Sequence, residues 1–400
     1  MHWRIVTAAV LALLAIDGPG HRTRAGESAP ADQAVDVWIP SGQSNACGRG
    51  RPPGPPASAA VEAFDPRGGK WVPARDPLPG MGTSGVGPWQ AAAAEYAART
   101  GRKVRLAGWA EGGISIDLWD AAKGSGWRAL SGVLERAGKG AGVLLWYQGE
   151  ADCGKAPDRY LAQFKDLTER VRKGCDNPGM TVVVVQLSAY QAGYDLGKDP
   201  PAKKPLARGD KSQIMLMRET QRQCVLGDDR AILVTAMGRK TQDYWHLSTE
   251  GQTELGGEIG RALAARLHKV DTGWPGPVLD AAVLGDDGKT VIAHFAEVKK
   301  LTGLAAADFG LVGTGAKAAE VQAAAAKAEA LGGTLVKLTF EEPVKLPAAL
   351  VYGLGSAPAA GLVDEAGNRA PAVQLEITQG KAPEDKETAA PNGAGAAARR

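Results

Sequence analysis

Five short apolar runs alternate with helix-like stretches over the first two thirds of the chain. The runs are residues 37–39, 104–107, 143–147, 181–187 and 231–234. The helix-like stretches are residues 90–99, 126–138, 159–173, 212–224 and 251–268. Strands that alternate with helices form β-α-β units, in which neighbouring strands run parallel. The sequence therefore predicts an α/β fold with five parallel strands covered by helices, over a domain at residues 34–270.

The pattern changes near residues 271–277, where Trp274-Pro275-Gly276-Pro277 is typical of a linker. Five short strands without long helices between them are expected at residues 278–283, 290–295, 334–340, 348–352 and 372–377. These predict a small β-sandwich over residues 275–378. The alanine-rich residues 316–331 could instead form one helix in or against it. Residues 379–400 carry almost no large apolar side chain, so we expect a disordered tail.

The first residues resemble an export signal. A positive charge at Arg4 precedes a mostly apolar run at residues 5–16, which is too short to cross a membrane comfortably. Residues 1–26 therefore predict a cleaved signal peptide and a secreted or periplasmic protein without a membrane span. Four cysteines fit an oxidising compartment. The formal net charge of +3, with acids and bases intermixed, gives no indication of a nucleic-acid partner.

Ser44 follows the first expected strand, in Ser41-Gly42-Gln43-Ser44-Asn45. Parallel sheets bind ligands at the carboxyl ends of their strands, so a serine there can act as a nucleophile. The alternative is a helix cap, because serine after a strand commonly caps the next helix. Both roles are compatible if Ser44 caps the helix while its backbone N–H faces the substrate.

A serine nucleophile needs a base, and elimination among the five histidines leaves His246. It follows the fifth expected strand, and Asp243, three residues earlier, can orient its ring. The alternative is a solvated loop histidine beside a capping aspartate. Gln148 follows the third strand and is a candidate donor to an oxyanion. Gly112 and Gly113, after the second strand, offer backbone N–H groups, although paired glycines often form only a turn.

Together these blocks resemble the SGNH (GDSL-like) hydrolases. More narrowly, they resemble the sialate O-acetylesterase-related group, which includes the acetylxylan esterases of carbohydrate esterase family six. The matching motifs are Gly-Gln-Ser-Asn at residues 42–45, Gly-Gly at 112–113, Gln-Gly-Glu at 148–150 and Asp-x-x-His at 243–246. Met217-Arg218-Glu219-Thr220-Gln221 is similar to a helix of the group. The chain departs from the pattern at Ile114 and Leu247.

The resemblance implies a flavodoxin-like strand order and a Ser44–His246–Asp243 triad. It also implies an oxyanion hole made by the N–H of Ser44, an N–H of Gly112 or Gly113, and the Gln148 side chain. No metal or cofactor is expected. Removal of O-acetyl groups from acetylated xylan or sialic acid would follow. The alternatives are another ester or thioester substrate, or an inactive carbohydrate-binding surface protein.

The motif segments suggest further residues of the site, and the flavodoxin-like strand order implies a pairing of the cysteines. Asn45 and Glu150 are expected to support the site or bind substrate, and Glu150 could assist His246 besides Asp243. Trp245 is a candidate substrate contact, whereas Trp146 and Trp119 are expected in the core. The cysteines are expected to pair as Cys47–Cys153 and Cys175–Cys224, with four buried free thiols as the alternative.

Overall fold

The described residues of the computed structural model start at Ala34 and belong to one compact unit. The described ranges are residues 34–82, 85–190, 213–315, 320–355 and 357–381. The expected signal peptide at residues 1–26 lies outside the described residues, and so does the expected tail from residue 382 onward.

An eight-stranded sheet organises the first part of the unit, in the order β3-β2-β4-β1-β6-β7-β8, with β5 beside β1. The five expected strands are present and adjacent in this sheet, and they pair in parallel. They are β4 (Lys103–Leu106), β1 (Val35–Gly42), β6 (Val143–Tyr147), β7 (Thr181–Gln186) and β8 (Ala231–Thr235).

Three further strands enlarge this sheet beyond the five expected from sequence. β2 (Val61–Asp65) runs parallel to β4, β3 (Lys70–Pro73) runs antiparallel to β2, and the short β5 (Trp109–Ala110) pairs with β1. β3 is the edge strand, and none of its four side chains is fully buried. An edge strand of this kind lacks the continuous apolar run by which the central strands were recognised.

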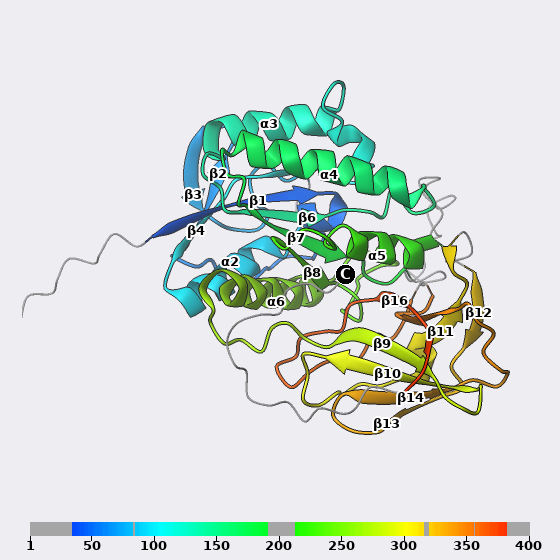
Figure 1. Ribbon diagram of the computed structural model, residues 1–400. Coiled ribbons are helices and arrows are strands. Elements are labelled where there is room, and N and C mark those ends of the chain that lie inside the picture. The colour runs from blue at the N-terminus through cyan, green and yellow to red at the C-terminus, as the bar shows by residue number, and fades with distance from the viewer. Residues whose placement is uncertain (1–33, 83–84, 191–212, 316–319, 356, 382–400) are drawn as a thin grey trace, which may run out of the picture. The chain divides into compact units, whose positions relative to one another are not determined.

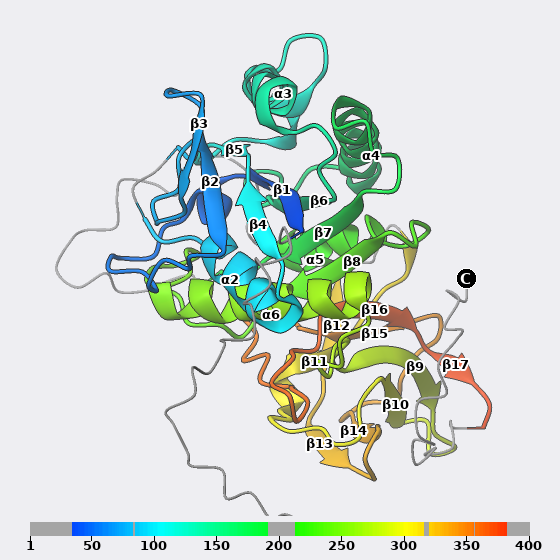
Figure 2. The ribbon, with the colours of Figure 1, turned by 90° about the vertical axis from the view of Figure 1, so that its left-hand side faces the viewer.

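Helices cover both faces of the sheet (Figures 1 and 2). α2 (Trp89–Thr100) and α6 (Thr249–His268) pack together on one face, and α3 (Ser125–Ala137) and α4 (Pro157–Gly174) pack on the other. α5 (Ile214–Gln223) contacts β7 and α4. The five helical stretches inferred from the sequence therefore correspond to α2 to α6, with shifts of a few residues at their ends.

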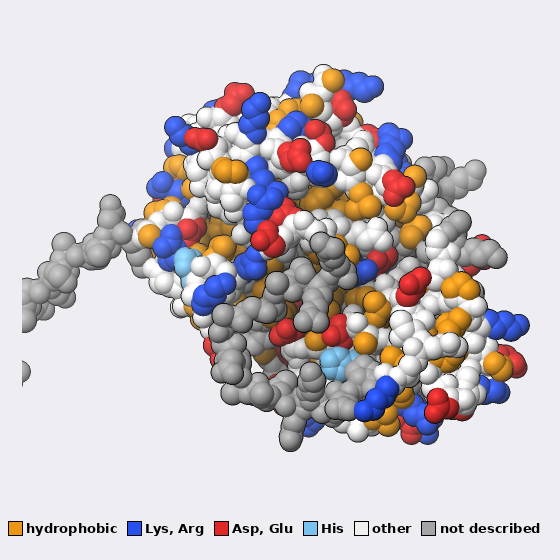
Figure 3. Space-filling view, viewed as in Figure 1, with side chains coloured by type: hydrophobic (Ala, Val, Ile, Leu, Met, Phe, Trp, Pro, Cys, Tyr) orange, Lys and Arg blue, Asp and Glu red, His pale blue; other side chains and the backbone are white. Residues whose placement is uncertain are grey.

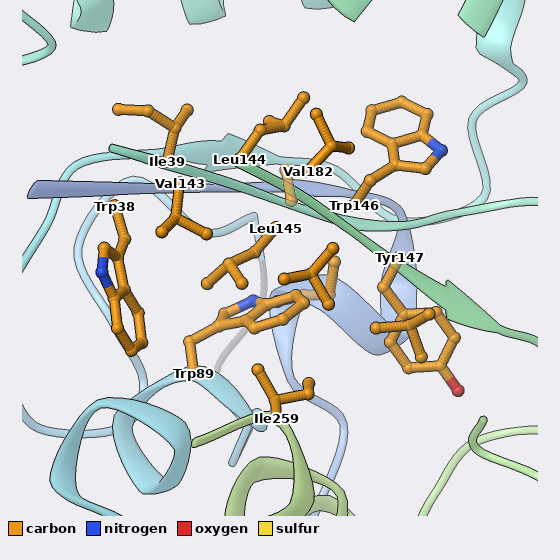
Figure 4. Packing of buried hydrophobic residues seen from close by; sticks show 14 of the residues in the cluster. Trp38, Ile39, Trp89, Val143, Leu144, Leu145, Trp146, Tyr147, Val182 and Ile259 are labelled. Carbon is orange, nitrogen blue, oxygen red and sulfur yellow. The ribbon is translucent and has the colours of Figure 1, made fainter. Parts of the chain in front are cut away.

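The core shows why the central strands are apolar on both sides. Figure 4 shows that Leu144 points to one face of β6, whereas Val143 and Leu145 point to the other, toward Trp89 and Ile259. All five side chains are completely buried. Burying a side chain of this size contributes about 1.5–3 kcal/mol, so these strands tolerate few polar residues.

The described residues from Val278 onward form two further sheets, and most of their buried apolar side chains belong to one cluster. Val312, Ala349 and Val351 belong instead to a separate cluster with Met215. The five-stranded sheet has the order β13-β14-β10-β9-β17, and the four-stranded sheet has the order β12-β11-β15-β16. The first consists of β9 (Val278–Leu284), β10 (Thr290–Ala296), β13 (Lys327–Ala330), β14 (Leu335–Thr339) and β17 (Thr378–Gln379). The second consists of β11 (Phe309–Val312), β12 (Val321–Ala324), β15 (Ala349–Tyr352) and β16 (Val373–Glu376).

Two sequence predictions for this region need correction. The alternative of one helix over residues 316–331 is wrong for the described residues, because 321–324 and 327–330 are strands β12 and β13. These strands pair with β11 and β14. The helix preference of alanine is only a few tenths of a kcal/mol per residue, so pairing overrides it. Gln379, assigned to the tail, lies in β17, which pairs with β9.

The four cysteines are free, so the expected pairs Cys47–Cys153 and Cys175–Cys224 are not formed. The Cys47 thiol lies against the backbone of Gly82, whereas the Cys153 thiol donates to the Gly149 carbonyl at 3.6 Å. In the second pair, Cys175 caps the end of α4, whereas Cys224 caps the end of α5, so the two thiols belong to the ends of different helices.

Charged side chains of both signs are intermixed on the face shown in Figure 3. This distribution agrees with the nearly balanced counts of basic and acidic residues. Within the described ranges, no helix combines the length and apolarity needed to cross a membrane.

Candidate active site

Ser44 is presented by a sharp turn at the carboxyl end of β1. Gly42 has a φ of +140°, and a Cβ atom there would stand 2.0 Å from the Tyr147 carbonyl oxygen of the neighbouring strand. Only glycine fits this position. The next N–H, that of Gln43, donates to the same carbonyl at 3.0 Å, and the four-residue helix α1 (Ser44–Cys47) begins at once.

The capping role expected for Ser44 is not observed. Gln43 holds the capping position, Ser44 is the first residue of α1, and no side chain caps this helix. The Ser44 Oγ atom instead lies 3.0 Å from Nε2 of His246, and the side chain is almost fully buried. The serine is therefore held for contact with the imidazole.

His246 lies in the loop between β8 and α6, where Asp243 orients it. The Asp243 Oδ2 atom is 2.7 Å from Nδ1 of His246, and Oδ1 accepts the backbone N–H groups of Trp245 and His246. Burial raises the pKa of Asp243, but the His246 hydrogen bond and these N–H groups outweigh it and hold the pKa below its ordinary value. Asp243 therefore stays ionised, which favours a proton on Nδ1 and leaves Nε2 free to accept the serine proton.

Asn45 joins the serine loop to the histidine loop. Its amide nitrogen donates to Glu150 Oε1 at 2.8 Å and to the Trp245 carbonyl at 3.2 Å, and its Oδ1 accepts the Leu247 N–H at 3.1 Å. Asn45 is completely buried. Glu150 therefore contacts Asn45, while Asp243 is the carboxylate bonded to the His246 ring.

The Gly112–Gly113 turn lies beside the serine. A Cβ atom on Gly112 would stand 3.8 Å from the Ser44 Cβ, so the two backbones meet at the end of β1. Gly113 has a φ of +73° and is exposed. Asp152 holds the same segment in place, because it accepts hydrogen bonds from Ser115 Oγ at 2.7 Å and the Ile116 N–H at 2.9 Å.

Gln148 is close to this segment, but its amide hydrogens have other acceptors. Nε2 donates to Gln43 Oε1 at 3.1 Å, to the Ile114 carbonyl at 3.2 Å and to Asp152 over a shorter distance. Its Oε1 accepts the Tyr160 hydroxyl at 3.0 Å. Gln148 is completely buried, so donation to an oxyanion would require one of these bonds to break.

An aromatic cluster lies next to the catalytic histidine. The Trp245 ring is 5.9 Å from His246 between centroids, and Tyr190 and Tyr244 lie 5.6 and 5.1 Å from Trp245. All three aromatic side chains are only partly buried. Trp245 therefore remains a candidate substrate contact. The core positions expected for Trp119 and Trp146 are confirmed, since both are fully buried.

Sequence reasoning missed Arg49. It lines a cavity of about 320 Å³ together with His246 and Asp243, and its Nη2 would be 2.7 Å from a Cβ on Gly112. The sequence feature that could have indicated Arg49 is its position between two glycines, five residues after Ser44.

The segment that carries Arg49 is held by residues 85–87. Gly50 and Val86 exchange two backbone hydrogen bonds, and the Gly87 N–H donates to Asp76 Oδ1 at 3.3 Å. Burial raises the pKa of Asp76 to about 6, despite this one hydrogen bond. Within the described part of the chain, no group of three or more metal-ligating side chains is arranged to hold a metal ion.

Comparison with known proteins identifies the family. The family described as carbohydrate esterase, sialic acid-specific acetylesterase, matches residues 34–265. A carbohydrate acetylesterase from Xanthomonas citri has a similar structure, with 18% identity, 85% of this chain and 80% of that chain covered, and a TM-score of 0.61. A protein from Arabidopsis thaliana is 22% identical over 60% of this chain and 99% of its own, with a TM-score of 0.46.

No curated protein matches the chain. The family match covers more than half of the chain and agrees with the motifs at residues 42–45, 112–113, 148–150 and 243–246. The resemblance inferred from those motifs is therefore confirmed. The chain belongs to the sialic acid-specific acetylesterase family of carbohydrate esterases, and it is a carboxylic ester hydrolase.

Proposed function

We propose that this protein is an exported serine esterase that removes O-acetyl groups from carbohydrate through an acyl-enzyme. The observation that carries the proposal is the relay of contacts from Ser44 Oγ to His246 Nε2 at 3.0 Å, and from His246 Nδ1 to Asp243 Oδ2 at 2.7 Å. These are the distances at which a base can take a serine proton.

In the first step, Ser44 attacks the acetyl carbon while His246 takes the hydroxyl proton. The tetrahedral intermediate collapses when His246 returns that proton to the sugar oxygen, which leaves acetyl on Ser44. Water then attacks the acyl-enzyme with His246 again as base, and acetate is released. Asp243 stabilises the imidazolium in both halves without accepting its proton.

The oxyanion formed in each half needs donors near Ser44. We propose the backbone N–H of Ser44 and an N–H of Gly112 or Gly113, because these backbones meet beside the serine. Gln148, expected from sequence as a third donor, faces Asp152, Gln43 and Ile114 instead. Its proposed role is to fix the loops that carry the backbone donors.

The proposed domains are a catalytic domain at residues 34–270 and a β-sandwich at 275–378. The contacts between them support a fixed arrangement. Gln186 exchanges two hydrogen bonds with the backbone of Ala372, at 2.9 and 2.7 Å. The buried Arg218 donates to the carbonyls of Gly355 at 2.9 Å and Ser188 at 2.7 Å, and Ser188 donates to the Trp245 carbonyl. The sandwich would thus support the loop of His246.

Export is proposed from the sequence of residues 1–26. Because the four cysteines are free thiols, disulfide bonds do not support export. N-terminal sequencing of protein recovered outside the cytoplasm tests the proposal, because an intact Met1 on the exported protein would contradict cleavage of a signal.

The test of the activity is Ser44→Ala, with hydrolysis of p-nitrophenyl acetate and release of acetate from acetylated glycans as readouts. We expect loss of both activities in a folded protein, and loss of labelling by a fluorophosphonate. Ser131→Ala, on α3 and away from the site, is the matched control. Retained hydrolysis in Ser44→Ala would overturn the proposal, and faster hydrolysis of longer acyl chains would point to another ester.

A further inference from the structure

The mechanism decides on which side of Ser44 the sugar lies. His246 Nε2 must return its proton to the sugar oxygen, so the leaving sugar has to occupy space that His246 lines. The cavity of about 320 Å³ satisfies this condition, because it is lined by His246, Gln242 and residues 48–52. The inference below rests on the proposed esterase function and concerns the sugar in this cavity.

The charge of this cavity is positive. Arg49 and Arg51 both line it, and the acidic residue among its lining residues is Asp243. Asp243 is already bonded to the His246 ring and to two backbone N–H groups. Within the described ranges, neither arginine forms an ion pair.

Arg49 is half-buried, and part of its guanidinium has no acceptor. Its Nε atom is buried and has no hydrogen-bond partner among the described residues. A buried donor without an acceptor costs about 1–3 kcal/mol, more for a charged group. A ligand that supplies an acceptor to this guanidinium would recover that cost. A carboxylate fits best, because its two oxygens match the guanidinium fork.

The position of Arg49 limits where such a carboxylate can be. A Cβ on Gly112 would contact Arg49 Nη2 at 2.7 Å and Ser44 Cβ at 3.8 Å, so the guanidinium and the nucleophile flank the same glycine. An ester bound at Ser44 and a carboxylate bound at Arg49 must therefore be close together in the substrate. A sugar ring that carries both groups meets this condition.

The space beyond the first cavity allows a longer glycan. A second cavity of about 370 Å³ shares Arg51 and Gln242 with the first and continues along Thr241 and Thr249. Its cation Lys240 is paired with Glu250 at 2.7 Å. Arg49 and Arg51 are therefore the positive charges available to an anionic sugar next to the ester.

We propose that Arg49 is a specificity-determining residue that selects O-acetylated sugars with a carboxylate on the same ring, as in an acetylated hexuronate. Such a substrate supplies acceptors to the half-buried Arg49 guanidinium as its ester reaches Ser44. A neutral acetylated sugar leaves Arg49 unpaired, so it is hydrolysed less efficiently.

The test compares two acetylated methyl glycosides that differ in one group, a hexuronate and its neutral carboxamide. We expect kcat/KM of the unaltered enzyme to be at least tenfold higher for the carboxylate. Arg49→Gln should bring the ratio near one, and Arg49→Lys, which keeps the charge without the fork, should give an intermediate ratio. Arg67→Gln, which removes an exposed positive charge elsewhere, should keep the full ratio.

Two failures are distinguishable. If the unaltered enzyme hydrolyses p-nitrophenyl acetate but shows no preference for the carboxylate, or if Arg49→Gln keeps the preference, the inference about Arg49 is wrong. If it hydrolyses no acetyl ester at all, the proposed function is wrong. A 9-O-acetyl sialoside is the third substrate. It tests the placement of the carboxylate, because its carboxylate is remote from the ester. Faster hydrolysis of this compound than of the hexuronate would overturn the placement of the carboxylate beside the ester.

Discussion

Asp76 supplies the sharpest test of the energetics around the site. Its Oδ1 atom accepts a hydrogen bond from the Gly87 N–H, in the segment of residues 85–87 that holds Arg49. Its buried Oδ2 atom has no partner among the described residues. Burial raises the pKa of Asp76 from 3.8 to about 6. The folded protein therefore holds this proton more tightly than the unfolded chain does.

The sign and size of the effect of Asp76 on the free energy of unfolding follow from this pKa. Below pH 3.8 the group is protonated in both states and contributes no penalty. Between pH 3.8 and about 6 the unfolded chain ionises first, so the free energy of unfolding falls as the pH rises. Above pH 6 the penalty is complete, and the difference between 3.8 and about 6 corresponds to about 3 kcal/mol. Asp76→Asn removes the charge and should recover up to this amount.

The assay is urea denaturation of the two proteins at several pH values between 4 and 8, followed by tryptophan fluorescence. We expect Asp76→Asn to be more stable than the unaltered protein at pH 7, with a difference that shrinks toward pH 4. Asp229→Asn, at an exposed aspartate, should show no such trend. A difference that is absent at pH 7, or independent of pH, would refute the reasoning.

Three further predictions concern the catalytic loops. Asp243→Asn should lower kcat for p-nitrophenyl acetate by roughly 10⁴-fold, because the imidazole loses its orienting charge; a loss under tenfold would exclude Asp243 as the orienter. Gly42→Ala should cost more than about 4 kcal/mol of unfolding free energy, since its Cβ meets Tyr147, whereas Gly132→Ala, in open space on α3, should gain about 0.5–1 kcal/mol. Asn45→Ala should reduce kcat and lower the urea midpoint, because it disconnects the two loops; an unchanged kcat would show that they hold their positions separately.

Much of the catalytic domain was predictable because its signals are local. The apolar runs of β1, β6 and β7 record burial on both faces of a sheet, and their alternation with helices implies parallel pairing. Each motif follows one of the strands expected from the sequence, which places it at the carboxyl edge of the parallel sheet. Ser44, Asp243 and His246 could therefore be nominated before their contacts were known.

Other features depend on partners that are distant in the sequence. Pairing with β11 and β14 makes strands of the alanine-rich β12 and β13, against a weak local preference for helix. The expected cysteine pairs are not formed: Cys47 and Cys153 contact different backbone groups although their strands are adjacent, and Cys175 and Cys224 lie at the ends of different helices. Gln148 lies where expected, but Asp152 and Gln43 determine the direction of its amide.

The sequence by itself determined the five central parallel strands of the catalytic domain, the family and the residues that can carry the reaction, because burial periodicity and short motifs are written in neighbouring positions. Only the tertiary structure decided that Ser44 meets His246 across 202 positions of the chain and that Arg49 stands unpaired beside them. Such contacts arise from the packing of several elements at once, and no local pattern records which side chains will face one another.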